Sequence, residues 1–218
     1  MTNKLALFDC DGTMVDSQHN ICAAMDWAFE KHDLPCPDHH MVRRIVGLSL
    51  TEAIGRLLPD QDDALIAEIV QSYKDGFVEL RQAGSVTEPL YDGLAELLDL
   101  LEAAGWVLGV ATGKSDRGLH HVLEAHGLKD RFITLQTADR HPSKPHPAMV
   151  ELAMAEAGAV ADTTWMIGDT SFDMEMAVNA GVRAIGVDWG YHDEDELRDA
   201  GAETVAMQML DLNGILNQ

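Results

Sequence analysis

The feature that most constrains the fold of this chain is a short apolar run near its N-terminus that ends in an acidic pair. Residues 5–8 read Leu-Ala-Leu-Phe, and an unbroken run of this kind is typical of a strand buried on both faces of a parallel sheet. Asp9 and Asp11 follow, and then Gly12 and Thr13. Ligands of open α/β sheets bind at the carboxyl ends of the strands, so the two aspartates are candidate catalytic residues. Carboxylates so close together repel each other unless a cation lies beside them, and Mg²⁺ prefers oxygen ligands.

The pattern of the remaining chain predicts an α/β fold with an inserted helical unit. Between residues 16 and 87 the apolar residues recur at helical spacing. From residue 88 on, helical and strand-like segments alternate, which is typical of a doubly wound parallel sheet. We therefore expect a Rossmann-like core built from residues 1–15 and 88–218, with a small helical cap domain and its hinge segments at 16–87. Further strands are expected at 106–111, 132–135, 164–167, 182–187 and 204–206, and a last helix at 207–216.

The charge of the chain argues against polyanionic partners. Its 218 residues include 15 Lys and Arg against 37 Asp and Glu, a formal net charge of -22. Nucleic acids and acidic membranes are bound through basic side chains, so we expect neither as a partner. The 3 cysteines fit no disulfide or metal framework and indicate a reducing compartment. Without a run of apolar residues long enough to span a membrane, we expect a cytoplasmic protein, as a monomer or homodimer.

Two further groups of candidate residues follow later strands. Thr112, Gly113 and Lys114 end the second strand, where a hydroxyl and a glycine ahead of a helix can cradle a phosphate. Helix capping is the simpler role for that hydroxyl if it is considered alone. Asp169 ends the fourth strand, and Asp173 falls in the first turn of the next helix, facing back toward the same place. The helix dipole explains an acidic residue at position 173, but it does not explain one at the strand end.

These strings together resemble the motifs of the haloacid dehalogenase-type hydrolases. The Asp-Cys-Asp-Gly-Thr string at 9–13 resembles the first motif, Thr112 the second, Lys144 in a Lys-Pro-His-Pro string the third, and Gly-Asp-Thr-Ser-Phe-Asp at 168–173 the fourth. The resemblance covers nearly the whole chain. It implies that Asp9 attacks phosphorus to form an aspartyl-phosphate, and that Asp11 protonates the leaving group and later activates water.

The same resemblance implies roles for the other candidates. Thr112 would hold a phosphate oxygen beside the backbone N–H of Gly113, with Gly12 and Lys114 also near the phosphate. Lys144 would neutralise the nucleophile and the transferring group, since phosphoryl transfer depends on positioning and charge stabilisation. Mg²⁺ would be held by Asp9, the backbone carbonyl of Asp11 and Asp169, with Asp173 as a ligand or an orienting group.

The helical insert resembles the four-helix cap of the phosphoglycolate phosphatase and β-phosphoglucomutase branch. We therefore predict a Mg²⁺-dependent phosphatase, similar to phosphoglycolate phosphatase, that hydrolyses a small-molecule phosphate monoester. Arg43 and Arg44 are adjacent cations in a very acidic chain and are candidates for substrate selection by the cap, with solvated helix positions as the alternative. A β-phosphoglucomutase-like phosphotransferase is the nearest alternative function. It is disfavoured because Ile21 stands where those mutases have a histidine.

Three other interpretations fit the motifs less well. A receiver-like phospho-switch shares an acidic Mg²⁺ pocket, a Thr and a Lys on a doubly wound sheet, but it lacks a helical insert and a second aspartate at this spacing. A partner-binding pseudo-enzyme is disfavoured by the complete set of Asp9, Asp11, Lys144 and Asp169. A carbon–halogen hydrolase on the same fold should lack Asp11.

Overall fold

The computed structural model describes residues 2–218, and its centre is a six-stranded parallel sheet. The strand order is β3-β2-β1-β4-β5-β6, so the strand that ends in the acidic pair lies in the middle of the sheet. The strands span β1 Asn3–Phe8, β2 Trp106–Thr112, β3 Phe132–Thr137, β4 Ala159–Gly168, β5 Arg183–Val187 and β6 Thr204–Ala206. From β1, the chain adds strands first on one side (β2, β3) and then on the other (β4, β5, β6), so the winding of the sheet reverses between β1 and β4. Doubly wound sheets bind their ligands at such a reversal. The predicted fold class is confirmed.

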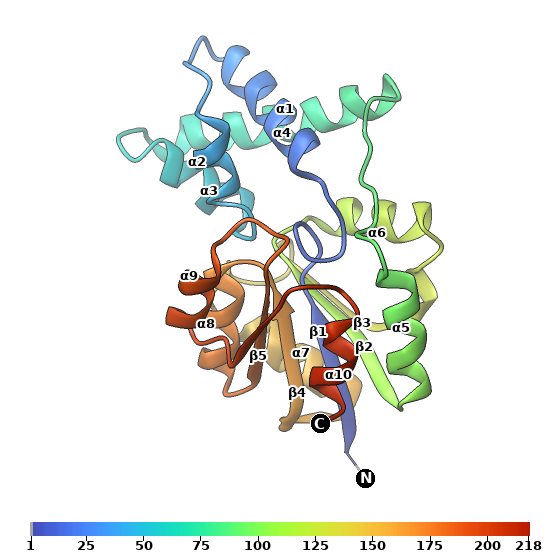
Figure 1. The fold of residues 1–218 in the computed structure, drawn as a ribbon. Coiled ribbons are helices and arrows are strands. Elements are labelled where there is room, and N and C mark those ends of the chain that lie inside the picture. The colour runs from blue at the N-terminus through green and yellow to red at the C-terminus, as the bar shows by residue number, and fades with distance from the viewer. Residues whose placement is uncertain (1) are drawn as a thin grey trace.

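Helices cover both faces of the sheet (Figure 1). Helices α5, α6 and α10 pack on one face around an apolar cluster that includes Phe8 and Ile167, and α7, α8 and α9 pack on the other around Leu7 and Met166. The alternating side chains of β1 and β4 thus feed two separate layers of core. The helices span α5 Leu94–Ala103, α6 Asp116–Ala125, α7 Ala148–Ala157, α8 Ser171–Ala180, α9 Glu194–Asp199 and α10 Asp211–Leu216, with a short 3₁₀ turn at Lys129–Arg131.

Four helices between β1 and α5 pack on one another around a third apolar cluster, which includes Met25, Phe29 and Ile69. They span α1 Gln18–Glu30, α2 His39–Arg43, α3 Leu50–Leu57 and α4 Asp63–Gln82. Figure 1 shows them above the carboxyl ends of the strands. The two chain segments that lead into and out of this helical unit run side by side, since the N–H of Asp16 donates to the carbonyl of Pro89 at 2.9 Å.

One loop of the helical unit contacts the core directly. Ile45 and Leu48 of this loop, with Ala53 of α3, pack against Phe172 of α8 in a fourth apolar cluster, and the N–H of Ser49 donates to Oγ of Ser143 at 2.8 Å. The helical unit therefore rests on the core beside the ends of β1, β2 and β4.

The structure departs from the sequence expectations mainly near the C-terminus. Helix α9 was not expected, because it buries only Leu197 and so shows no apolar periodicity in the sequence. A capping box between Asp193 and Glu196 marks its start. The last helix starts at Asp211, not at residue 207, and β4 begins earlier than expected, at Ala159. Among residues 2–218, no helix combines the length and apolar composition that crossing a membrane requires.

Candidate active site

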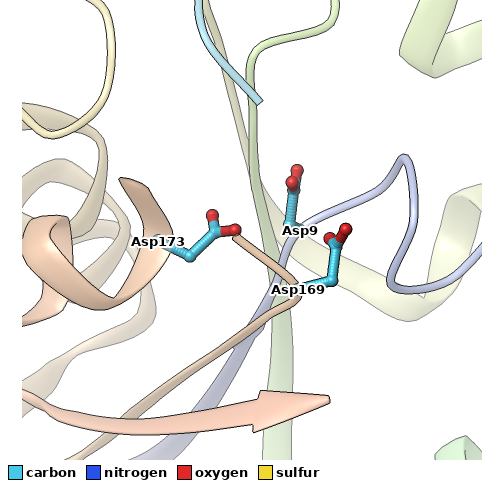
Figure 2. Close-up of side chains that lie close together, drawn as sticks. All are labelled: Asp9, Asp169 and Asp173. Atoms are coloured by element: carbon cyan, nitrogen blue, oxygen red, sulfur yellow. The ribbon is translucent and has the colours of Figure 1, made fainter. Parts of the chain in front are cut away.

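Three aspartates meet at the carboxyl ends of the central strands. Asp9 follows β1, Asp169 follows β4, and Asp173 comes from the first turn of α8. Each offers a carboxylate oxygen within 4.8 Å of the others, and all three side chains are buried (Figure 2). Strand ends and a helix start fix these carboxylates, so their convergence does not depend on a flexible loop.

Asp9 is fully buried and only partly hydrogen bonded. Its Oδ1 accepts the N–H of Cys10 at 2.6 Å and lies 3.0 Å from Nζ of Lys144. Its Oδ2 is buried and has no hydrogen-bond partner among the described residues. Burial raises the pKa of Asp9 to about 7, even though the Lys144 ammonium acts in the opposite direction. A buried oxygen without a partner is costly unless a ligand completes it, so Oδ2 points to a cation or a phosphoryl group.

Lys144 places a fixed cation against the nucleophile candidate. It lies in the loop between β3 and α7, is buried, and its Nζ is 2.6 Å from Oδ1 of Asp173. Burial alone would lower the pKa of Lys144, but the adjacent carboxylates of Asp173 and Asp9 raise it, so the ammonium stays charged. Two acidic partners and the absence of solvent hold this side chain in one position.

Asp169 and Asp173 are held by different donors. Oδ1 of Asp169 accepts the hydroxyl of Thr13 at 2.8 Å, and its Oδ2 accepts the N–H of Tyr191 at 3.0 Å. Burial raises the pKa of Asp169, and the negative charges of Asp9 and Asp173 raise it further. Oδ2 of Asp173 accepts the hydroxyl and the N–H of Thr170, at 2.7 and 3.1 Å. Asp173 thus has both oxygens engaged, one of them by Lys144.

Gly12 makes room for the carboxylate of Asp169. Its φ of +85° is a conformation that L side chains rarely adopt, and a Cβ atom there would lie 2.2 Å from Oδ2 of Asp169. The structure thus shows a steric reason for glycine at this position. A contact between Gly12 and phosphate stays a prediction, since this residue does not line the cavity described below.

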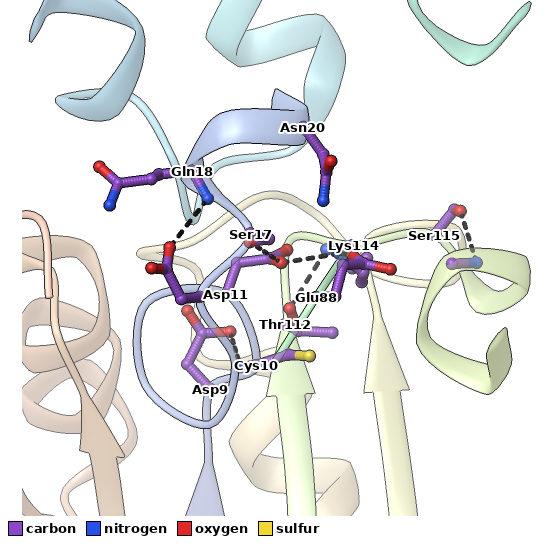
Figure 3. Close-up of polar contacts among 12 residues, drawn as sticks. Asp9, Cys10, Asp11, Ser17, Gln18, Asn20, Glu88, Thr112, Lys114 and Ser115 are labelled. Carbon is purple, nitrogen blue, oxygen red and sulfur yellow. Dashed lines mark hydrogen bonds and ion pairs between the residues drawn. The ribbon is translucent and has the colours of Figure 1, made fainter. Parts of the chain in front are cut away.

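The second aspartate of the pair is held by the segment that leads into the helical unit and by the loop that follows β2 (Figure 3). Oδ1 of Asp11 accepts the hydroxyl of Ser17 and lies 2.7 Å from Nζ of Lys114. The same ammonium lies 3.0 Å from Oε1 of Glu88, so Lys114 bridges two carboxylates. Burial opposes the charge of Lys114, but Asp11 and Glu88 raise its pKa. The structure therefore places Lys114 in contact with Asp11, the candidate for proton transfer. A contact between Lys114 and phosphate stays a prediction.

The ends of β2 and the helical unit enclose a cavity of about 460 Å³ above the aspartates. Asp9 and Asp11 line its floor, together with Thr112, Gly113 and Lys114. Gly113 is a close-approach position, because a Cβ atom would lie 2.5 Å from the carbonyl oxygens of Gly47 and Leu48 in the loop of the helical unit. The predicted phosphate cradle therefore lies beside Asp9, under the helical unit.

Arg43 and Arg44 are not brought to this cavity, since neither lines it. The guanidinium of Arg44 forms a two-pronged salt bridge with Glu196 of α9, with one N–O distance of 2.6 Å, and lowers the pKa of that carboxyl to about 2. Its backbone carbonyl accepts Nε2 of the buried His192 at 3.2 Å. The structure thus gives Arg44 a role in joining the helical unit to the core, which the two adjacent arginines in the sequence did not reveal.

Three residues around the site were not singled out by sequence patterns. Thr13 holds Asp169 through its hydroxyl, and its place in the first motif is the only hint of that contact. Tyr191 contributes its backbone N–H, which any residue other than proline could supply. Glu88 comes from a connecting segment without periodicity, so its contact with Lys114 follows only from the folded chain.

The donor set fits a hard divalent cation. The carboxylates of Asp9, Asp169 and Asp173 supply only oxygen ligands, and the unpartnered Oδ2 of Asp9 is available for one. Asp173 already bonds Lys144 and Thr170, which favours an orienting role for it over direct ligation. The hydroxyl of Thr13 and the N–H of Tyr191 would hold the carboxylate of Asp169 in position, as hydrogen-bond donors behind the direct ligands do in metal sites.

Comparison with known proteins agrees with this geometry. Residues 6–187 match the sequence model of the family described as "Haloacid dehalogenase-like hydrolase". The "Probable phosphatase IndB" of Dickeya dadantii is 41% identical over 92% of this chain and 88% of its own length, and the "Phosphoglycolate phosphatase" of Vibrio parahaemolyticus is 29% identical over 96% and 94%. The crystal structure of "a predicted phosphatase from Clostridium acetobutylicum" matches with a TM-score of 0.88 and 26% identity, covering 100% of both chains. The chain belongs to the haloacid dehalogenase-like hydrolase family.

Proposed function

We propose that this protein is a Mg²⁺-dependent phosphatase that hydrolyses a small-molecule phosphate monoester through an aspartyl-phosphate at Asp9. The observation that carries the proposal is the buried, unpartnered Oδ2 of Asp9 at the floor of a cavity, with the Lys144 ammonium 3.0 Å from its Oδ1. One oxygen is neutralised and fixed, and the other is free to react. This is the arrangement that a carboxylate nucleophile needs.

The first half of the reaction uses Asp9 and Asp11. Oδ2 of Asp9 attacks phosphorus, a phosphorus–oxygen bond forms, and the bond from phosphorus to the ester oxygen breaks. Asp11 gives its proton to that oxygen, so the alcohol leaves neutral. Lys144, the hydroxyl of Thr112 and the N–H of Gly113 hold the negative oxygens of the transferring group.

The second half releases phosphate. Asp11, now ionised, takes a proton from a water molecule that attacks phosphorus, and the bond to Oδ2 of Asp9 breaks. Ser17 and Lys114 hold Oδ1 of Asp11, which leaves its other oxygen for these proton transfers. Asp11 thus acts as the general acid in the first half and as the general base in the second, as microscopic reversibility requires.

Asp9, Asp169 and the backbone carbonyl of Asp11 would hold the Mg²⁺ ion, with Asp173 orienting Lys144. When bound, the ion would supply positive charge beside the phosphoryl oxygens. We also propose that residues 16–87 form a cap that keeps water out of the cavity and presents the leaving group, with residues 1–15 and 88–218 as the catalytic core.

The relatives support a phosphatase, since the Dickeya dadantii and Vibrio parahaemolyticus proteins both carry that name. A phosphoglycolate phosphatase-like activity is consistent with the second of them. The mutase alternative requires a polar group in the cap that can hold a sugar and relay a proton. Ile21 is buried in the apolar cluster of the helical unit and supplies neither.

The test is phosphate release from a panel of phosphorylated metabolites and p-nitrophenyl phosphate, with Mg²⁺ and with a chelator. We expect turnover that depends on Mg²⁺ and is restored by adding the ion back. A purified, folded protein that releases phosphate from none of these esters would contradict the proposal.

A further inference from the structure

The distribution of ion pairs identifies two basic side chains whose role the catalytic site does not explain. In this acidic chain, eleven of the 15 Lys and Arg residues lie within 4.0 Å of a carboxylate. Within residues 2–218, the four without such a partner are Lys4, Arg43, Lys74 and Arg117. Lys4 stacks on the ring of Trp106, at 4.8 Å. Lys74 and Arg117 both line the cavity above the aspartates.

These two cations approach the cavity from different parts of the molecule. Lys74 belongs to α4 in the helical unit, and Arg117 to the first turn of α6 in the core. Apart from Asp9 and Asp11, the acidic residues on the same lining are already engaged: Asp75 accepts Nε2 of Gln71 at 2.8 Å and pairs with Lys31, and Asp139 accepts the N–H of Asp116 at 2.8 Å. Nothing acidic on the cavity wall therefore neutralises Lys74 or Arg117.

Lys74 lies away from the catalytic end of the cavity. On α4, Arg81 pairs with Glu88, which in turn contacts the lysine that holds Asp11, so this end of the helix faces the aspartates. Lys74 is two helical turns earlier, about 10 Å along the axis. Tyr73 and Phe77, with ring centroids 5.3 Å apart, add apolar surface to the cavity lining on the same helix.

We propose that Lys74 and Arg117 bind a second anionic group of the substrate, so that the preferred substrate is a sugar-sized phosphate monoester with a carboxylate at its far end. This inference rests on the proposed phosphatase function. A cavity of about 460 Å³ falls within the roughly 300–1,000 Å³ of small-molecule sites, which leaves room for a ligand larger than a two-carbon ester. A guanidinium and an ammonium suit a carboxylate, and the net charge of -22 disfavours a second phosphate, which carries more negative charge.

Two probes isolate the second charge. 6-Phosphogluconate and sorbitol 6-phosphate have the same open six-carbon chain and differ at the far end only in a carboxylate against a hydroxymethyl group. We expect the KM of the native protein for 6-phosphogluconate to be about tenfold lower, with kcat within about twofold, and phosphoglycolate to have a lower kcat/KM than 6-phosphogluconate. Lys74→Met and Arg117→Met should each raise the KM for 6-phosphogluconate about three- to fivefold.

Matched controls separate this role from damage to the fold. Kinetics with sorbitol 6-phosphate should be unchanged in both variants, and Lys4→Met, which removes a cation far from the cavity, should change neither substrate. Three results would overturn the inference. They are equal KM values for the two probes in the native protein, equal losses of kcat/KM on both probes in the variants, and a higher kcat/KM for phosphoglycolate than for 6-phosphogluconate.

A binding measurement keeps this inference separate from the proposed function. The dissociation constants of both probes, measured by calorimetry with Asp9→Asn, should show the same tenfold preference without any turnover. A protein that hydrolyses no ester but binds 6-phosphogluconate selectively would contradict the phosphatase proposal and support the second anion site. A protein that hydrolyses the esters but binds both probes equally well would support the phosphatase proposal and contradict the second anion site.

Discussion

The ammonium of Lys144 lies 3.0 Å from Oδ1 of Asp9, and both side chains are withdrawn from solvent. The sheet brings them together: Asp9 follows the central strand β1, whereas Lys144 lies between β3 and α7. A buried ion pair of this kind is weak evidence for stability, because the cost of desolvation offsets much of the attraction. Asp9, but not Lys144, lines the cavity, and Oδ2 of Asp9 has no hydrogen-bond partner among the described residues, which indicates a pair arranged for chemistry at that oxygen.

Asp9→Asn should abolish activity and stabilise the metal-free protein. We expect turnover to fall by roughly three or more orders of magnitude, because the covalent route cannot start. Burial raises the pKa of Asp9 from 3.8 to about 7, so between these values the folded state binds more protons than the unfolded state. Stability conferred by the protonated group is therefore lost as pH rises toward 7. The variant should have a higher melting temperature than the native protein at pH 8, and this difference should shrink toward pH 4. Thermal melts of both proteins across this pH range check the prediction. A lower melting temperature for the variant at pH 8 would argue against it.

Mg²⁺ should raise the melting temperature, and more so at pH 8 than at pH 6. Burial raises the pKa of Asp9 and of Asp169, so protons compete with the cation at the lower pH. Asp169→Asn should remove most of the Mg²⁺-induced shift, whereas Asp139→Asn, which changes a carboxylate on the cavity wall, should retain it. Thermal melts with Mg²⁺ or a chelator make the comparison without an activity assay. An unchanged shift in Asp169→Asn would rule out that residue as a ligand.

The sequence reveals the catalytic end of the site better than the surfaces that surround it. Asp9 and Asp169 follow strands with strong apolar patterns, and parallel strands bring their carboxyl ends to one edge, so periodicity groups these two. Lys144 lies in the loop between β3 and α7 and was predicted only through the resemblance of its Lys-Pro-His-Pro string to a family motif. Contacts between the helical unit and the core depend on how two separately packed layers meet. The salt bridge from Arg44 to Glu196 joins residues 152 positions apart and has no local signature.

The connecting segments and the C-terminal helices were harder to predict for a related reason. Helix α9 buries a single side chain, so its capping residues and not its periodicity define it. Glu88 lies in a stretch with neither helical nor strand spacing, and only the folded chain places it beside Lys114. Lys74 lies on the polar side of a long helical stripe, where a solvated position is the usual outcome.

Arg44→Ala should weaken the attachment of the helical unit without changing which substrate is preferred. Its guanidinium pairs with Glu196, and the pair is partly exposed, so we expect a loss of roughly 0.5–1 kcal/mol in the free energy of unfolding. Glu196→Gln should cost about as much, and the double variant should cost little more than either one, because both remove the same interaction. Urea melts check this cycle. A change in the ratio of kcat/KM values between two esters would instead support substrate selection by Arg44.

Net phosphate release, without isomerisation of a sugar phosphate, is expected from any accepted ester. The helical unit carries Ile21 in its packed interior, where a mutase would need a group that holds the sugar. Incubation with β-glucose 1-phosphate and its bisphosphate, followed by assays for glucose 6-phosphate and inorganic phosphate, distinguishes the two reactions. Glucose 6-phosphate forming faster than phosphate would establish the mutase instead.

The most direct test of the central claim is to trap the phosphoenzyme. Asp11→Asn should slow the attack of water more than the attack of Asp9 on an activated ester, so acid quenching during turnover of p-nitrophenyl phosphate should capture the intermediate. Mass spectrometry of the digested protein should find one phosphoryl group on the peptide that contains Asp9, sensitive to hydroxylamine and missing from the Asp9→Asn, Asp11→Asn double variant. A phosphoryl group on another residue, or none while phosphate is still released, would contradict the account.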